Sequence, residues 1–85
     1  MRLIFAEQAW DDYLFWQRTD PKIVRRIHEL IKDTTRRPLE GIGKPEPLRH
    51  ALAGYWSRRI TGEHRMVYKA AGADLLIAQL RYHYR

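Results

Sequence analysis

Three residues of this sequence, Glu46, Arg65 and His83, have side chains that could together move protons around a phosphate. Glu46 lies between two prolines, which fix their own backbone and hold the glutamate in an extended conformation. Arg65, with Arg59 near it, could hold a phosphate oxygen and stabilise charge that grows in a transition state. His83 stands between two tyrosines near the chain end, and such rings could stack on unpaired bases.

These side-chain types fit cleavage of RNA without a metal ion. A base such as Glu46 takes the proton from a ribose 2′-hydroxyl, which then attacks the neighbouring phosphate. Arg65 stabilises the extra charge, and an acid such as His83 protonates the 5′ leaving oxygen. Because the attacking hydroxyl belongs to the substrate, proximity supplies much of the rate. DNA lacks this hydroxyl and should be inert.

Each of these residues also has an ordinary interpretation. A loop carboxylate such as Glu46 is usually only solvated. Arg65 could form a cross-strand ion pair with Glu63 or Glu40. Chain ends are commonly poorly ordered, which would apply to His83. From the residues alone, these alternatives stay open.

The sequence gives no sign of a metal site or another cofactor. The histidines at 28, 50, 64 and 83 lack ligand spacing, and the glycines at 41 and 43 lack the context of a phosphate-binding loop. His28 borders an apolar helical stripe, where we expect a packed or half-exposed histidine. A second acid–base pair, His50 with His64, is conceivable and ranks below Glu46 with His83.

Residues 54–68 organise the predicted fold, because they read as two strands joined by a turn. Tyr55–Ile60 and Met66–Tyr68 have strand character, and Thr61–Glu63 supplies the turn between them. Successive side chains of a strand face opposite sides, so Arg59 shares a face with Tyr55 and Ser57. Guanidinium groups are costly to bury unless anions meet them. We therefore expect a cationic sheet face suited to phosphate.

The remaining pattern predicts an α+β fold in which two N-terminal helices pack on one face of a mostly antiparallel, twisted β-sheet. The first helix is expected from Ala6 to about Gln17, and Leu48–Leu52 could form one further turn in the loop that follows the second helix. The other expected elements are a strand over Arg2–Phe5, a helix opened by Asp20-Pro21 and ended by Arg37-Pro38, and a central last strand over Leu75–Leu80.

Strict alternation along the strands predicts which side chains lie on each face of the sheet. The helix-covered face is expected to carry Ile60, Met66, Tyr68, Leu76, Ala78 and Leu80. The open face is expected to carry Arg59, Arg65, Lys69, Gln79, Arg81 and His83, together with Val67 and Ile77.

The composition of the chain limits the number of domains, the kind of partner and the cellular compartment that we expect. The chain has 85 residues, which we interpret as one domain over residues 1–85, with a formal charge of +6 and a pI of about 10.1. This charge favours polyanionic partners, with nucleic acid first. The absence of cysteine fits a reducing cytoplasm, and the short apolar N-terminal run predicts no membrane span.

The sequence resembles the YoeB toxins of the RelE superfamily in WDDYLFWQ (residues 10–17), in KPEPLRHALAGYWSRRITGEHRMVY (residues 44–68) and in the terminal RYHY (residues 81–84). The resemblance covers essentially the whole chain, and the middle segment is highly specific. It implies a RelE-like fold and a small cytoplasmic toxin of a bacterial type II toxin–antitoxin pair. It further implies a ribosome-dependent endonuclease that cuts mRNA in the ribosomal 30S A site, a homodimer, and a YefM-like antitoxin whose acidic tail covers the site.

The resemblance also implies roles for individual residues. Glu46 matches the family's base, Arg65 its phosphate-stabilising arginine and His83 its terminal acid. Arg59 and Tyr84 match positions that grip the substrate. At a further substrate-binding position this chain has Arg49 where the family usually has lysine, which keeps the charge and makes a poor proton donor.

Two other functions are compatible with such a chain. A relative of the ParE kind would inhibit DNA gyrase without cutting RNA, and would need neither Glu46 nor His83. A non-catalytic RNA- or ribosome-binding module would show strongly salt-dependent binding without cleavage products.

Overall fold

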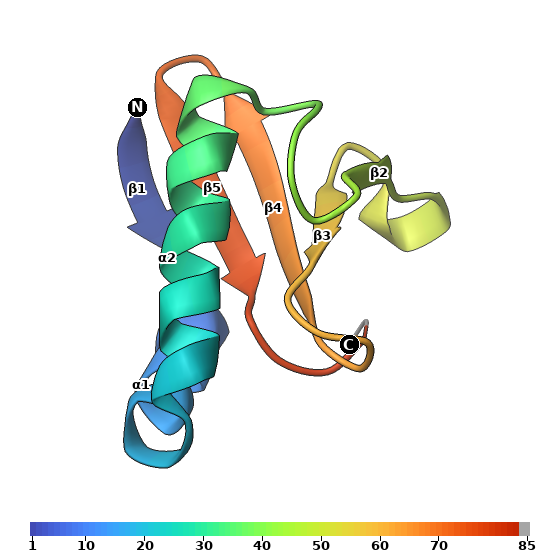
Figure 1. Cartoon of the computed structure of the whole chain (residues 1–85). Coiled ribbons are helices and arrows are strands. Elements are labelled where there is room, and N and C mark those ends of the chain that lie inside the picture. The colour runs from blue at the N-terminus through green and yellow to red at the C-terminus, as the bar shows by residue number, and fades with distance from the viewer. Residues whose placement is uncertain (84–85) are drawn as a thin grey trace.

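The structure, a computed structural model, describes residues 1–83, so Tyr84 and Arg85 lie outside the described residues. Two helices cover one face of a five-stranded sheet (Figure 1). In chain order the elements are β1 (Arg2–Phe5), α1 (Glu7–Thr19), α2 (Pro21–Arg36), β2 (Glu46–Pro47), the 3-10 helix η1 (His50–Leu52), β3 (Trp56–Arg59), β4 (Arg65–Ala71) and β5 (Asp74–Gln79). The predicted α+β layer arrangement is confirmed.

The second helix forms where its sequence signals place it. The Asp20 carboxylate accepts a hydrogen bond of 3.0 Å from the backbone N–H of Lys22, and Pro21 occupies the first helical position. Ile27 and Leu30 of the apolar stripe are fully buried in the core. Among residues 1–83, no helix is both long and apolar enough to cross a membrane.

The strands follow the order β1-β5-β4-β3-β2, with β1 parallel to β5 and every other pair antiparallel. β5 therefore has a neighbouring strand on each side, β1 and β4, as its apolar composition predicts. The sequence assigns Glu46 and Pro47 to a loop, but they pair with Ser57 and Trp56 as the edge strand β2. Proline is tolerated there because an edge strand leaves one row of backbone groups unpaired. The predicted helical turn appears as η1.

A β-bulge in β5 interrupts the alternation of its side chains. Tyr68 of β4 lies opposite Ile77, whereas its neighbour Val67 lies opposite Gln79. Ala78 is consequently the extra residue on β5. Positions before and after Ala78 therefore follow opposite parities.

The bulge makes part of the predicted face assignment wrong. Leu75 and Ile77 are fully buried in the core on the helix side, whereas strict alternation predicts Leu76 and Ala78 there. Beyond the bulge the assignment holds again, because Leu80 is fully buried in the same core. Because the bulge at Ala78 reverses the parity, the two residues after it lie on the faces that the sequence predicts, with Leu80 on the helix side.

Candidate active site

A polar cavity of about 120 Å³ opens on the face of the sheet opposite the helices. One water takes up about 30 Å³ of liquid, so the cavity is nearer the size of a phosphate group than of a nucleotide. It is lined by Lys44, Glu46, Ser57, Arg59, Arg65 and His83. The structure thereby brings together four of the six residues nominated from the sequence, including the carboxylate, the guanidinium and the imidazole.

The register of the strands explains how four of the lining side chains come to the same face. Glu46 of β2 lies opposite Ser57 of β3, and Arg59 of β3 lies opposite Arg65 of β4. Ser57 and Arg59 are two residues apart and point to the same face, so all four side chains project from that face. Alternate strands are about 10 Å apart, and the side chains of Glu46 on β2 and Arg65 on β4 both line the cavity over β3.

The Arg65 side chain is held by the turn that precedes it. Its Nη1 donates to the backbone carbonyls of Thr61 at 2.8 Å and Gly62 at 3.1 Å, and the residue is 8% exposed. Within residues 1–83 no carboxylate forms an ion pair with Arg65, so the alternative of a pair with Glu63 or Glu40 is not observed. The guanidinium is therefore pre-oriented, and its charge suits an anion.

Arg58 points the opposite way from its neighbour Arg59 and is fully buried on the helix side. Its Nη1 forms an ion pair of 2.7 Å with Oδ2 of Asp33 in α2. Its guanidinium also donates to the carbonyls of Arg37, Glu40 and Ile42. The segment between α2 and β2, which leads to Glu46, is thus fixed against α2.

Asp33 holds the same segment from the helix. It accepts hydrogen bonds of 2.9 Å from Nη2 of Arg37 and from the backbone N–H of Ile42. These bonds, with the one from Arg58, keep the pKa of the Asp33 carboxyl well below its usual range. Gly41 has a φ of 116°, and a Cβ at this position would lie 2.0 Å from Oδ2 of Asp33, so only glycine fits.

His83 reaches the cavity because the chain turns back after β5. The backbone N–H of Arg65 donates to the Tyr82 carbonyl at 2.8 Å, which places the returning segment beside β4. The prediction that Arg81 lies on the open face is wrong, since its guanidinium carbon is 3.6 Å from the ring centroid of Phe15 in α1. β5 ends at Gln79, so strand alternation no longer determines where Arg81 points.

The other histidines have partners elsewhere. His28 is exposed and shares a hydrogen bond of 2.7 Å with the Tyr13 hydroxyl. His64 packs edge-on against Trp16, with ring centroids 4.9 Å apart. Neither His64 nor His50 lines the cavity, so the geometry does not support them as an acid–base pair there. Within residues 1–83 no group of acidic or histidine side chains has the arrangement of a metal site.

Some residues differ from expectation in their relation to the cavity. Arg49, predicted to bind substrate, is exposed and does not line it. Lys44 and Ser57 do line it, and sequence reasoning gave neither a role. Signals for both were present, since Lys44 is two residues from Glu46 and Ser57 shares the strand parity of Arg59. Arg58 was missed too, although its parity places it on the core face.

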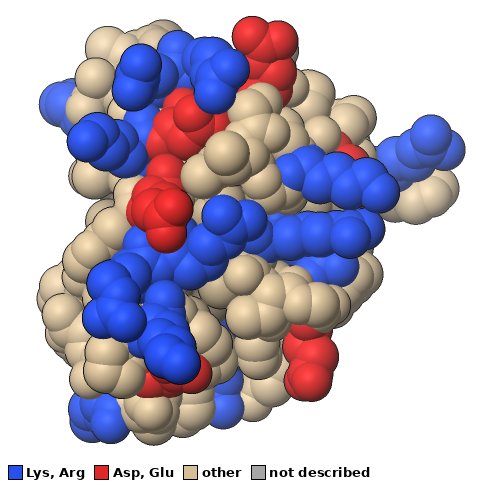
Figure 2. Space-filling view, in the orientation of Figure 1, with Lys and Arg blue, Asp and Glu red and all other residues tan. Residues whose placement is uncertain are grey.

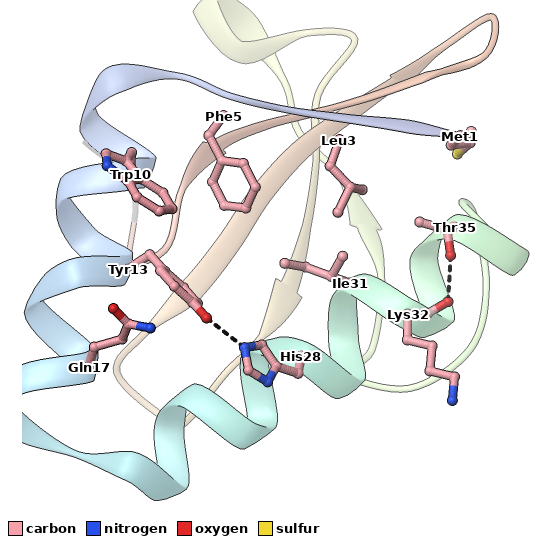
Figure 3. A pocket seen from close by; sticks show the side chains of 10 residues that line it. All are labelled: Met1, Leu3, Phe5, Trp10, Tyr13, Gln17, His28, Ile31, Lys32 and Thr35. Carbon is pink, nitrogen blue, oxygen red and sulfur yellow. Dashed lines mark hydrogen bonds between the residues drawn. The ribbon is translucent and has the colours of Figure 1, made fainter.

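A larger hollow of about 720 Å³ lies between β1 and the two helices (Figure 3). Phe5, Trp10 and Tyr13 line it and form a cluster of ring contacts, and Trp10 is 47% exposed. An exposed apolar surface of this kind is typical of protein–protein contact. Its chemistry is unlike that of the cation-rich cavity on the sheet.

Two helices packed on one face of a five-stranded, mostly antiparallel sheet give this chain a RelE-like fold. Residues 5–84 match the family described as "YoeB-like toxin of bacterial type II toxin-antitoxin system". The chain is 64% identical over 84 residues to Toxin YoeB of Escherichia coli K12, covering 99% of this chain and 100% of that protein. The chain belongs to the YoeB-like toxin family.

Solved structures agree with this assignment. A YoeB dimer from Staphylococcus aureus has a TM-score of 0.93 at 47% identity, over 99% of this chain and 98% of that one. A heterotetrameric YoeB–YefM toxin–antitoxin complex from the same organism has a TM-score of 0.92 at 47% identity, with the same coverage.

Proposed function

We propose that this protein is a ribosome-dependent endoribonuclease that cleaves mRNA in the ribosomal A site and so inhibits translation in the cytoplasm. The observation that carries this proposal is the cavity itself, in which Glu46, Arg65 and His83 line one space large enough for a phosphate. They come from β2, β4 and the segment after β5, so the fold unites groups that are distant in sequence. No metal ion is required by the proposed chemistry.

In this reaction Glu46 takes the proton from the ribose 2′-hydroxyl, and the oxygen attacks the adjacent phosphorus. Arg65 binds the non-bridging oxygens, where negative charge increases in the transition state. His83 protonates the departing 5′ oxygen. The products are one strand ending in a 2′,3′-cyclic phosphate and one beginning with a free 5′-hydroxyl.

Further cations extend the anion-binding surface around this centre. Arg59 and Lys44 line the cavity with Glu46 and would add positive charge around the phosphate. We assign Arg49 and Tyr84 to substrate binding outside the described cavity lining, through a phosphate and a base respectively. Arginine in place of the family's lysine at position 49 supports binding rather than proton transfer.

A large RNA partner fits the surface charge. Figure 2 shows Lys and Arg side chains forming a band that runs from α2 toward the side of β2 and β3. Such a band suits the phosphate backbone of ribosomal RNA, which binds cations without regard to sequence. The ribosome would then present the mRNA to the cavity and restrict cleavage to the A site.

Two protein partners complete the proposal: a YefM-like antitoxin and a second copy of this chain. The solved relatives described as a YoeB dimer and a YoeB–YefM complex support both. An acidic antitoxin segment could cover the cationic cavity by folding onto it. The apolar hollow beside Trp10 is suited to contact with protein and offers little to RNA.

The test is cleavage of mRNA on translating ribosomes by the purified protein, with 5′ ends mapped by primer extension. We expect ends at codons positioned in the A site, and none with an Arg65→Met variant that folds normally. Intact transcripts with arrested DNA supercoiling would instead indicate gyrase inhibition of the ParE kind. Salt-sensitive ribosome binding without cut ends would indicate a binding module.

A further inference from the structure

We infer that His64 and Gln79 are positioning residues that hold His83 at the cavity, an inference that rests on the proposed function. Neither residue lines the cavity. Both bind the backbone of the segment after β5, which carries His83 close to the chain end. A general acid must lie within hydrogen-bond reach of the leaving oxygen, so a segment outside the strands needs contacts with the rest of the protein to orient it.

The segment after β5 begins at Leu80, whose backbone is hydrogen-bonded to two side chains of α1. The Leu80 backbone N–H donates to Oδ2 of Asp12 at 3.0 Å, and Nε1 of Trp16 donates to the Leu80 carbonyl at 2.7 Å. Asp12 and Trp16 are both buried, so these bonds form away from water. The chain therefore leaves β5 in one direction, and the contacts of the next three residues determine where His83 lies.

His64 fixes the turn at Tyr82. Its Nδ1 accepts a hydrogen bond of 2.7 Å from the Tyr82 backbone N–H, while the Tyr82 carbonyl accepts one of 2.8 Å from the backbone N–H of Arg65. Tyr82 has a φ of 65°, in the left-handed region that non-glycine residues seldom adopt without support. His64 is itself held edge-on against Trp16, so its acceptor nitrogen is aimed at the turn.

Gln79 fixes the same segment from inside the sheet. Its side-chain Nε2 donates to the carbonyls of Arg81 at 2.8 Å and His83 at 3.0 Å. The β-bulge puts Gln79 opposite Val67 on the open face, from which its amide reaches these carbonyls. The Gln79 amide and the His64 imidazole thus bracket the segment, and the backbone of His83 is bonded directly.

The acceptor and the ring of His64 can be separated by substitution. His64→Phe keeps an aromatic ring against Trp16 and removes the acceptor. His64→Asn removes the ring and places an amide oxygen near the position of Nδ1. Gln79→Met keeps the length of the side chain and removes the donor to His83. His28→Phe is the matched control, since this histidine also makes one hydrogen bond and does not line the cavity.

Two measurements test the inference on full-length protein. The first is the single-turnover rate of cleavage on programmed ribosomes as a function of protein concentration, which separates the maximal rate from binding. We expect His64→Phe and Gln79→Met to lower the maximal rate by about tenfold or more, without weaker binding. We expect His64→Asn to recover most of the rate, and His28→Phe to match the wild type.

The second measurement is amide hydrogen exchange at Tyr82, which does not depend on activity. Exchange should be faster in His64→Phe than in the wild type, and slow again in His64→Asn. The positioning role would be overturned if His64→Phe cleaved mRNA and exchanged the Tyr82 amide at the wild-type rates. It would also be overturned if His64→Asn lost as much cleavage activity as His64→Phe. A wild type that binds ribosomes without cutting would contradict the proposed function instead, while exchange at Tyr82 would still report on the contact.

Discussion

Arg58 and Asp33 form an ion pair of 2.7 Å on the helix side of the sheet, one residue before Arg59 turns its side chain into the cavity on the other side. The Arg58 guanidinium is fully buried and also binds carbonyls of the segment that leads to Glu46. A buried pair of this kind seldom adds much net stability, but it specifies one arrangement of the groups it joins. Here it specifies the path of the segment that delivers the candidate base.

Removing Arg58 should therefore destabilise the fold as well as the site. Arg58→Met removes the donor to three part-buried carbonyls and one of the three residues that donate to the Asp33 carboxylate, and we expect a loss of about 3–5 kcal/mol in the free energy of unfolding. Urea unfolding measures this loss. Arg25→Met, at an exposed position of α2, is the control and should change the free energy by less than about 0.5 kcal/mol. Equal values for the two variants would contradict the structural role of Arg58.

The lowered pKa of the Asp33 carboxyl leads us to expect a specific dependence of the free energy of unfolding on pH. Its pKa is lower in the folded protein than the unfolded value of about 3.9, so its contribution is fully present above that pH and is lost as pH falls toward the folded pKa. We expect Asp33→Asn to be less stable at pH 7 and to lose less stability than the wild type on acidification below about pH 4. Urea unfolding across this range tests the expectation.

Asp74→Asn is the comparison for this experiment, because Asp74 pairs with Arg2 at the surface. Such a pair contributes about 1 kcal/mol or less. If the stability of the wild type and of Asp33→Asn fell in parallel with acidification, the ion-pair network would not carry the stabilisation assigned to it.

Glu46→Gln tests the base without changing the shape of the side chain. The amide cannot accept the 2′-hydroxyl proton, and we expect the cleavage rate to fall by about 10²- to 10⁴-fold. Binding to ribosomes and the unfolding curve should remain those of the wild type, because Glu46 is exposed on the edge strand β2. A cleavage rate close to that of the wild type would remove Glu46 from the mechanism.

The close approach of Gly41 to Asp33 predicts a strong effect of a single methyl group. Gly41→Ala would place its Cβ 2.0 Å from Oδ2 of Asp33 at a φ of 116°, so we expect lower stability and lower cleavage activity. Gly62→Ala is the matched control, since its Cβ would meet nothing within 4 Å. Thermal unfolding of the two variants compares them, and equal melting temperatures would refute the packing argument.

The helices and the order of the main strands along the chain followed from local signals. Asp20-Pro21 set the start of α2, and the apolar run over Leu75–Leu80 indicated a central strand. The edge strand β2 escaped prediction because its two residues, Glu46 and Pro47, are too few to show a periodic pattern, and its pairing depends on β3 being present. Such pairing is a property of the tertiary structure.

The sequence predicted the main residues that line the cavity, but not the bulge and the buried contacts that hold them in place. Strand parity predicted that Arg59 and Arg65 share a face, and the family resemblance pointed to Glu46 and His83. Alternation failed at Ala78, because a bulge depends on the fit between two strands and leaves no mark in the sequence. Strand parity placed Arg58 on the core face, but the sequence did not show what would compensate its buried charge, because its partners are mostly backbone carbonyls, which any sequence supplies.

The most direct test of the central claim is single-turnover cleavage, on ribosomes, of an mRNA with one 2′-deoxynucleotide at the position 5′ to the cut. Glu46, Arg65 and His83 around one phosphate can cut only if the neighbouring 2′-hydroxyl attacks it. We predict no cut at the substituted position, and a 2′,3′-cyclic phosphate on the product of the unmodified mRNA. Cleavage of the deoxy-substituted mRNA at an undiminished rate would contradict the account.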